Sequence, residues 1–188
     1  MAWKKSAVKK VYTEASLYEY AVRALGSRMR TVAELKRLMR TRAANQPDCD
    51  LLIEAVTARL KQQHYLNDTS YAASYSVSRR DNEKFGRTRV VQDLRAKGVH
   101  PEVIDKTVGE TYSEVDEQKL ARQFADRKRL KQPKDQKEAG RIFRMMARAG
   151  FSSRVIVQLL RHWHVEDETL SALEQEREMT EGPIEDES

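Results

Sequence analysis

The sequence predicts an all-α protein built from three tandem three-helix repeats that stack into an elongated, curved array. Gly occurs 7 times and Pro 4 times in 188 residues, and the abundant residues Ala, Leu, Arg, Lys, Glu and Gln lose little side-chain freedom in a helix. No stretch alternates apolar and polar residues with the period of two that indicates a half-buried strand. Apolar residues instead recur at helical spacing, in sets that repeat at intervals of about 50 residues.

The first repeat contains three expected helices. Capping-box patterns, in which Ser or Thr is followed three residues later by Glu, occur at 16–19 and 31–34 and mark helix starts. The first pattern predicts a helix over 17–26, and the second predicts one that ends near Arg42. After a break at a proline, a third helix runs over 52–63.

The second repeat opens at Asp68, which we expect to be the N-cap of a helix with Tyr71 and Tyr75 on its apolar face. A second helix ends near Gly98, because glycine tolerates the left-handed conformation that often follows a helix. Pro101 then stands where a first-turn proline is well tolerated, so it begins the third helix.

In the third repeat, Ser113 is expected to open the first helix. Asp135 and Glu138 form another capping-box pattern before the second helix, and Gly150 ends that helix. One of the serines at 152–153 begins the last helix. The second helices of the second and third repeats thus both end at a glycine, whereas the first repeat has Ala43 at this place.

The expected organisation is a flexible basic arm, three repeats and an acidic tail, at residues 1–14, 15–66, 67–112, 113–163 and 164–188. The arm either has no role or contacts DNA. The tail is expected to be disordered; alternatively it folds back on a basic face as an electrostatic shield, or it contacts a basic partner protein.

Several functional classes are disfavoured by residue content. The lone Cys49 cannot form an intramolecular disulfide and fits the reducing cytoplasm, and the sequence shows neither a secretory signal nor a membrane-spanning stretch. Four scattered histidines make no zinc pattern, and no phosphate-binding loop or nucleophile elbow occurs. We therefore expect a non-enzymatic, cytoplasmic monomer that needs no metal or other cofactor.

The net charge of +6 is concentrated in the middle of the chain. Residues 164–188 carry ten acidic side chains and one arginine, so residues 15–163 are more positive than the chain as a whole. Such a basic body favours a polyanionic partner, most simply nucleic acid or a nucleoprotein. The alternative is a well-solvated surface that happens to be basic.

Arginines recur on the polar sides of the second helices, and in repeat register several of them coincide. A row of guanidinium groups across stacked repeats could follow a phosphate backbone or an acidic groove. The simpler interpretation is that helices carry Arg on the solvated side. The candidate binding residues are Arg37, Arg40, Arg89, Arg95, Arg141, Arg144 and Arg148. In the basic arm, Trp3 and Tyr12 are weaker candidates for stacking on bases.

Three segments together resemble the RecX family of bacterial regulators of the RecA recombinase. YLND at 65–68, followed by SYAASYSVSR at 70–79, is similar to that family's turn and aromatic helix. FGRTRVVQDLRAKGV at 85–99 and TVAELKRLMR at 31–40 are similar to two further family segments. The resemblance covers about residues 15–163, so it does not extend to the acidic tail or the lysine-rich arm.

The resemblance implies three tandem three-helix repeats and no enzymatic activity. It also implies a regulator in recombination and SOS repair that binds the RecA–DNA filament, lies in its groove and restrains ATPase and strand exchange, with modest direct binding to single- and double-stranded DNA. The seven candidate arginines come from repeat register, because the family has no invariant contact set. The alternatives are a general helical DNA-binding module that acts independently of RecA and a helical scaffold for an acidic protein.

Overall fold

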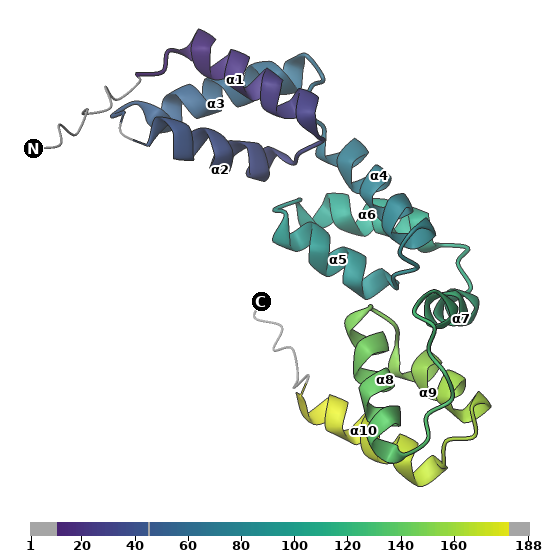
Figure 1. Cartoon of the computed structure of the whole chain (residues 1–188). Helices are drawn as coiled ribbons and strands as arrows, with labels where there is room; N and C mark the ends of the chain where they lie inside the picture. The colour runs from purple at the N-terminus through teal and green to yellow at the C-terminus, as the bar shows by residue number, and fades with distance from the viewer. Residues whose placement is uncertain (1–10, 45, 181–188) are drawn as a thin grey trace, which may run out of the picture. The chain divides into compact units, whose positions relative to one another are not determined.

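The structure is a computed structural model, and it describes residues 11–44 and 46–180. The described residues form ten α-helices and no strand, which confirms the predicted all-α class (Figure 1). Nine of these helices make up the three tandem repeats, three to a repeat, and the tenth follows them. The helices are α1 (Glu14–Ser27), α2 (Val32–Ala43), α3 (Cys49–Gln62), α4 (Asp68–Asp81), α5 (Arg87–Ala96), α6 (Pro101–Tyr112), α7 (Glu117–Arg127), α8 (Gln136–Arg148), α9 (Ser153–His162) and α10 (Asp167–Thr180).

The helices pack into two compact units, and the division between them runs through the second repeat. Unit 1 comprises the residues up to Ala73 together with Leu94–Ile104, and unit 2 comprises Ser74–Asp93 together with the residues from Asp105 onward. Helices α4, α5 and α6 therefore contribute residues to both units.

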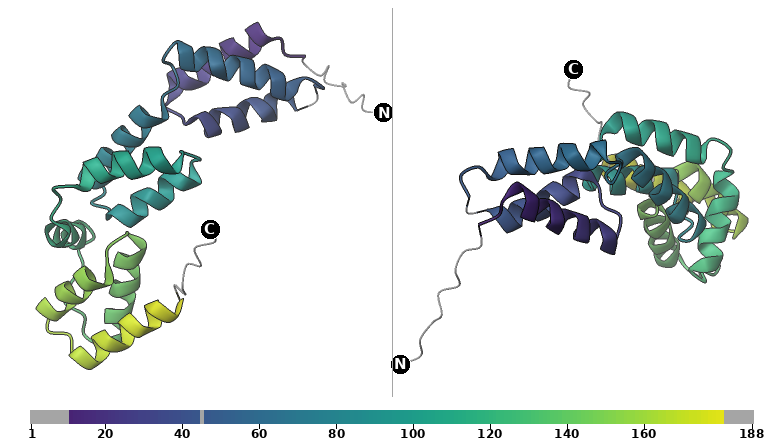
Figure 2. Two further views of the ribbon diagram at one scale, coloured as in Figure 1. Left: turned by 180° about the vertical axis from the view of Figure 1, so that it is seen from behind. Right: turned by 90° about the horizontal axis from the view of Figure 1, so that it is seen from above.

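In unit 1, α1, α2 and α3 lie side by side and form a three-helix bundle (Figures 1 and 2). Each helix turns an apolar stripe inward, so that Leu17 of α1, Leu35 and Met39 of α2, and Ile53 and Leu60 of α3 are fully buried. Burial of large aliphatic side chains is the main stabilising contribution in such a bundle.

The predicted start of α1 is wrong. The N-cap is Thr13, whose side chain accepts a hydrogen bond from the Ser16 N–H at 3.3 Å, and the Ser16 hydroxyl accepts one from the Thr13 N–H at 2.9 Å. The capping box therefore uses Ser16 as its third residue, not as its cap. The helix begins at Glu14, so part of the segment that the sequence assigns to a flexible arm is ordered; residues 1–10 lie outside the described residues.

The N-cap role expected of Asp68 is also wrong. The amide oxygen of Asn67 accepts from the Ser70 N–H at 3.0 Å, which makes Asn67 the capping side chain of α4. The Asp68 carboxylate instead accepts from the Val32 N–H at 2.9 Å. Val32 is the first residue of α2, so its N–H has no acceptor within that helix, and Asp68 supplies one. Burial raises the pKa of Asp68 above its ordinary value.

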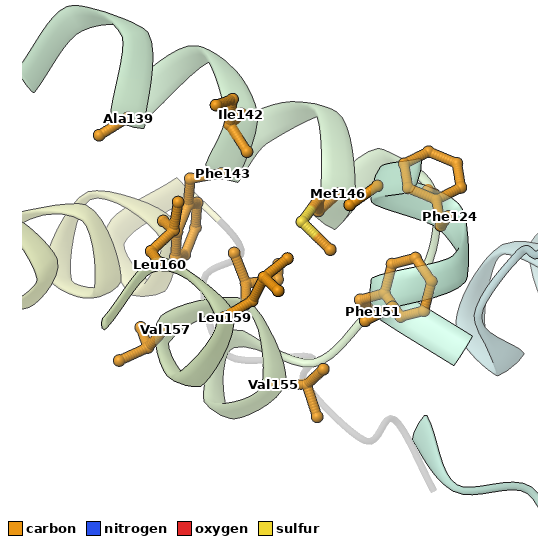
Figure 3. Packing of buried hydrophobic residues seen from close by; sticks show 14 of the residues in the cluster. Phe124, Ala139, Ile142, Phe143, Met146, Phe151, Val155, Val157, Leu159 and Leu160 are labelled. Atoms are coloured by element: carbon orange, nitrogen blue, oxygen red, sulfur yellow. The ribbon is translucent and has the colours of Figure 1, made fainter. Parts of the chain in front are cut away.

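Unit 2 has its own core, formed mainly by α7, α8, α9 and α10. Figure 3 shows Phe124 of α7 beside Phe151, and their ring centroids are 5.5 Å apart with the ring planes at 60°. Met146 of α8 and Leu160 of α9 are fully buried in the same cluster. The edge-to-face arrangement of the two rings is favoured by their quadrupoles.

The start of α7 differs from expectation, whereas the start of α8 agrees with it. Helix α7 begins at Glu117, four residues after the predicted start at Ser113. Its N-cap is Asp116, whose carboxylate accepts from the Gln118 and Lys119 N–H groups. At α8, Asp135 caps as expected and accepts from the Glu138 N–H at 2.7 Å. The reciprocal bond is shifted by one residue, because Glu138 accepts from the backbone N–H that precedes Asp135.

The expectation of a disordered tail over 164–188 is wrong for residues 167–180, which form α10. This helix packs on α8 and α9 and places Leu170 and Leu173 in the core of unit 2, where they are 1% and 7% exposed. The acidic composition suggested a solvating segment, but two leucines three positions apart supply enough apolar surface to hold the helix in place. Residues 181–188 lie outside the described residues.

Candidate polyanion-binding surface

In unit 2, the end of α8 meets the start of α5 at two glycines, a contact that we call the unit-2 junction. The Gly86 N–H donates to the Ala149 carbonyl at 2.9 Å. A Cβ on Gly86 would lie 2.2 Å from the Gly150 carbonyl oxygen, and a Cβ on Gly150 would lie 2.3 Å from the Arg89 nitrogen. Gly150 also has φ +91°. Only glycine at both positions allows the two backbones to approach this closely.

The side chain of Arg89 belongs to this junction. It donates to the Arg148 carbonyl at 3.4 Å, its Nε lies 3.0 Å from the Asp93 carboxylate, and its guanidinium lies 5.7 Å from the Phe85 ring centroid. Asp93 also accepts from the hydroxyl of Tyr75 at 3.0 Å. Arg89 therefore stabilises the contact between helices, and its charge is already compensated.

In unit 1, the end of α5 meets the start of α2 in a similar way, and we call this contact the unit-1 junction. The Thr31 hydroxyl donates to the Lys97 carbonyl at 2.7 Å. Gly98, at φ +75°, faces Ala33 so closely that an added Cβ would lie 2.5 Å from the alanine Cβ. The guanidinium of Arg37 lies 3.4 Å from the same point, so Arg37 flanks this junction.

Glu34 links the two helices of the unit-1 junction and also confirms the predicted capping box of α2. Its carboxylate accepts from Lys97 Nζ at 2.9 Å and from the Thr31 N–H at 3.3 Å, while the Thr31 hydroxyl accepts from the Glu34 N–H at 3.0 Å. Burial acts to raise the pKa of Glu34, but the hydrogen bonds from Lys97 and Thr31 and the positive charges of Lys97 and Arg28 outweigh it, so the pKa is lowered.

This lowered pKa predicts a pH-dependent contribution to stability. In the unfolded chain Glu34 takes up a proton at higher pH than in the folded chain, so its contribution is present above pH 4.5 and is lost as the pH falls below that value. We expect Glu34→Gln to cost about 1 kcal/mol at neutral pH and much less at pH 3, as measured by urea unfolding. Glu54→Gln, which removes an exposed carboxylate paired with Lys36, should change stability little at either pH. An equal cost for Glu34→Gln at both pH values would contradict the assignment.

Helix α8 carries three of the candidate arginines on one exposed face. Arg141, Arg144 and Arg148 are exposed, whereas Ile142 and Met146 on the opposite face are buried. Arg144 lies 3.5 Å from the carboxylate of Glu176 on α10, so the acidic helix compensates one charge of this face. The basic face of α8 therefore carries three exposed guanidinium groups, one of which is paired with a carboxylate.

The seven candidate arginines are not equivalent. Arg40 pairs with Asp50 at 2.8 Å, and Arg89 and Arg144 have the acidic partners described above. Among the described residues, no carboxylate forms an ion pair with the other four, which are Arg37, Arg95, Arg141 and Arg148. The three arginines of α8 lie on one face of the helix. Arg89 of α5 contacts the last residue of α8, Arg148.

The repeat register missed a second group of basic side chains. Arg23, Arg30 and Arg42 line a hollow in unit 1 together with Tyr12 and Tyr20. Tyr12 was a weak candidate for base stacking. Trp3, the other such candidate, lies outside the described residues. The sequence alone places Tyr20 and Arg23 three residues apart on one predicted helix. It does not show that Tyr12, Arg30 and Arg42, from other segments, line the same hollow.

The described residues contain no cluster suited to a metal ion, and the most strongly perturbed tyrosine has a structural role. Within residues 11–44 and 46–180, no group of three or more His, Cys, Asp or Glu side chains could hold a metal ion. Burial raises the pKa of Tyr112 well above its ordinary value, and its hydroxyl donates to the Phe85 carbonyl at 2.8 Å, so this group is structural. None of the described helices is long and apolar enough to cross a bilayer.

Tandem three-helix repeats with exposed arginines on their second helices define a helical-repeat protein with basic surface positions. A family model described as the second three-helix domain of RecX matches residues 67–108. The regulatory protein RecX of Trichlorobacter lovleyi is 31% identical over 145 residues, which cover 76% of this chain and 92% of the relative. That of Leptothrix cholodnii is 32% identical over 159 residues, covering 83% and 96%. The chain therefore belongs to the RecX family.

Solved structures agree with this assignment at the level of the fold. A crystal structure of a regulatory protein RecX matches with a TM-score of 0.63 at 21% identity and covers 79% of this chain and 71% of its own. The crystal structure of RecX from Lactobacillus salivarius matches with a TM-score of 0.58 at 19% identity and covers 80% and 96%. Both likenesses support the arrangement of the chain as tandem helical repeats.

Proposed function

We propose that this chain is a non-enzymatic regulator that binds the RecA–DNA filament and lowers its ATPase and strand-exchange activities. The proposal rests on membership in the RecX family and, within the chain, on the basic face of α8. A filament of protein and DNA presents both carboxylates and phosphates, and guanidinium groups bind either with paired, charge-assisted hydrogen bonds. The proposal expects a cytoplasmic monomer that needs no cofactor.

The α8 face suits this role better than the other candidate positions. Its helix is held by the Asp135 cap and by a buried apolar side, so its exposed side chains can be exchanged without disturbing the core. Arg141 and Arg148 form no ion pair among the described residues, so they would not have to break one on binding. Arg40 and Arg89 would each have to exchange an existing acidic partner for a new one.

The test is single-stranded-DNA-dependent RecA ATPase with this protein added at concentrations well below that of RecA. We expect inhibition at a small fraction of the RecA concentration, because a regulator that acts on the filament need not cover the DNA. Arg141→Glu/Arg148→Glu should raise the half-inhibitory concentration about tenfold or more, since two charges that attract the filament would then repel it.

The matched control is Arg122→Glu/Arg154→Glu, which reverses two exposed arginines of α7 and α9 in the same unit. This variant has the same net charge and should inhibit nearly as well as the unchanged protein. Equal losses in both variants would mean that only overall charge matters and would argue against the α8 face. If inhibition appeared only when the DNA itself was saturated, the protein would be a helical DNA-binding module acting independently of RecA.

A further inference from the structure

An open hollow of about 480 Å³ lies in unit 1 between α1, α2 and the residues just before α1. Its walls carry two tyrosines, Tyr12 and Tyr20, and three arginines, Arg23, Arg30 and Arg42. None of the described residues that line it is acidic. A hollow of this size is typical of small-ligand sites, and its unbalanced positive charge selects for an anion.

Two of the three arginines are oriented by backbone carbonyls rather than by carboxylates. Arg23 Nε donates to the Glu19 carbonyl at 3.3 Å, and Arg30 Nε donates to the Ala24 carbonyl at 3.2 Å. Neither arginine, nor Arg42, forms an ion pair with a carboxylate of the described residues. Their charge is therefore available to an incoming anion, and the terminal guanidinium nitrogens suit the paired oxygens of a phosphate.

The aromatic part of the hollow is held in place before any ligand binds. The side-chain amide of Gln46 donates to the Tyr12 carbonyl at 2.8 Å and accepts from the Tyr12 N–H, so both backbone groups of Tyr12 are fixed. The rings of Tyr12 and Tyr20 meet edge to face with centroids 6.5 Å apart. The guanidinium of Arg42 lies 5.1 Å from the centroid of the Tyr20 ring. Leu38 completes an apolar wall.

We propose that this hollow binds one nucleotide of a single-stranded nucleic acid, with a phosphate on its arginines and the base against its tyrosines and apolar wall. Aromatic rings, arginine planes and a basic track are the means by which proteins hold single strands without reading their sequence. This inference goes beyond the proposed function, because it assigns a binding site in unit 1 that is separate from the α8 face and whose occupation requires no RecA.

The first test is binding of the full chain to a fluorescently labelled oligothymidylate of about 20 nucleotides, followed by anisotropy without RecA. Arg23→Ala/Arg42→Ala is expected to weaken binding about tenfold and to reduce the slope of log affinity against log salt by about 0.7, since the hollow holds one phosphate and each phosphate contact on a single strand contributes about 0.7. The control Arg59→Ala/Lys61→Ala removes the same charge from exposed positions of α3 and should have a much smaller effect.

Equal losses in the two variants would overturn the proposal, because the hollow would then contribute only to general charge. A polyglutamate peptide that displaced the oligonucleotide, and whose own binding depended on Arg23 and Arg42, would also overturn it in favour of an acidic peptide. These outcomes are independent of RecA inhibition: a variant that loses the oligonucleotide and still inhibits RecA ATPase supports the hollow as a separate site.

A second measurement uses the unchanged protein and so does not depend on how well a variant folds. An oligonucleotide containing 5-iododeoxyuridine should crosslink under ultraviolet light to Tyr12 or Tyr20, as identified by mass spectrometry of the digested protein. Crosslinks confined to other segments would overturn the proposal. Tyr20→Leu keeps the apolar character and the charge but removes the ring, so it should weaken binding about fivefold while leaving the helical circular-dichroism signal unchanged.

Discussion

Replacing Gly150 by alanine is expected to destabilise unit 2 by about 3 kcal/mol. The backbone there has φ +91°, which an L side chain rarely adopts. The new methyl group would lie 2.3 Å from the Arg89 nitrogen, 2.7 Å from the Arg89 Cβ and 2.9 Å from the Gly86 carbonyl oxygen. Two of these three atoms are backbone, so relief requires the end of α8 and the start of α5 to separate, which would also break the hydrogen bond from Gly86 to Ala149.

Gly109→Ala in α6 provides the matched control, because no atom lies within 4 Å of the point that its new Cβ would occupy and its backbone is helical. This substitution should stabilise the protein by about 0.5–1 kcal/mol. Urea unfolding followed by circular dichroism compares the two variants, and hydrogen exchange of peptides from α8 and α5 locates the effect. If Gly150→Ala unfolded at the same urea concentration as the unchanged protein, the tight contact at the unit-2 junction would be refuted.

At the ends of the second helices, the sequence predicted the backbone conformation but not the contacts between helices. Gly98 and Gly150 were expected to end helices, and both have the positive φ that this role requires. The sequence did not show that each also packs against the start of another helix. The first repeat illustrates the difference: α2 ends at Ala43, and its C-cap Ala44 has the ordinary φ of −55°. The backbone conformation at a helix end depends on local residue type and can be predicted from the sequence. A close contact between helices depends on the packed fold and cannot.

The starts of α2 and α8 were predicted correctly, because Thr31 and Asp135 each cap the helix that follows them. Thr31 and Glu34 form the expected box. Asp68 had the right residue type at a helix start, but its carboxylate caps α2 from a distant part of the sequence, and the neighbouring Asn67 caps α4. Short polar side chains next to one another are equally good caps by composition. The choice between them was made by tertiary contacts.

The candidate site follows the same rule. Helical spacing correctly placed Arg141, Arg144 and Arg148 on the exposed side of α8, because a buried apolar face forces the opposite face outward. Spacing could not show that Glu176 of α10 pairs with Arg144 or that Asp50 pairs with Arg40. For the same reason, the hollow lined by arginines from two helices and the loop between them could not be assembled from the sequence.

Replacing Leu170 by alanine is expected to destabilise unit 2 by about 2–4 kcal/mol, because it removes a side chain that is 1% exposed from a closely packed core. The acidic segment would then be a structural part of the unit rather than a solvating tail. Met179→Ala is the control, since Met179 lies on the same helix and is 85% exposed; its effect should stay within about 0.5 kcal/mol. Thermal unfolding of both variants measures the difference. If Leu170→Ala lowered the stability no more than Met179→Ala, α10 would contribute nothing to the core. The helix that positions Glu176 beside Arg144 would then not be held in place by Leu170.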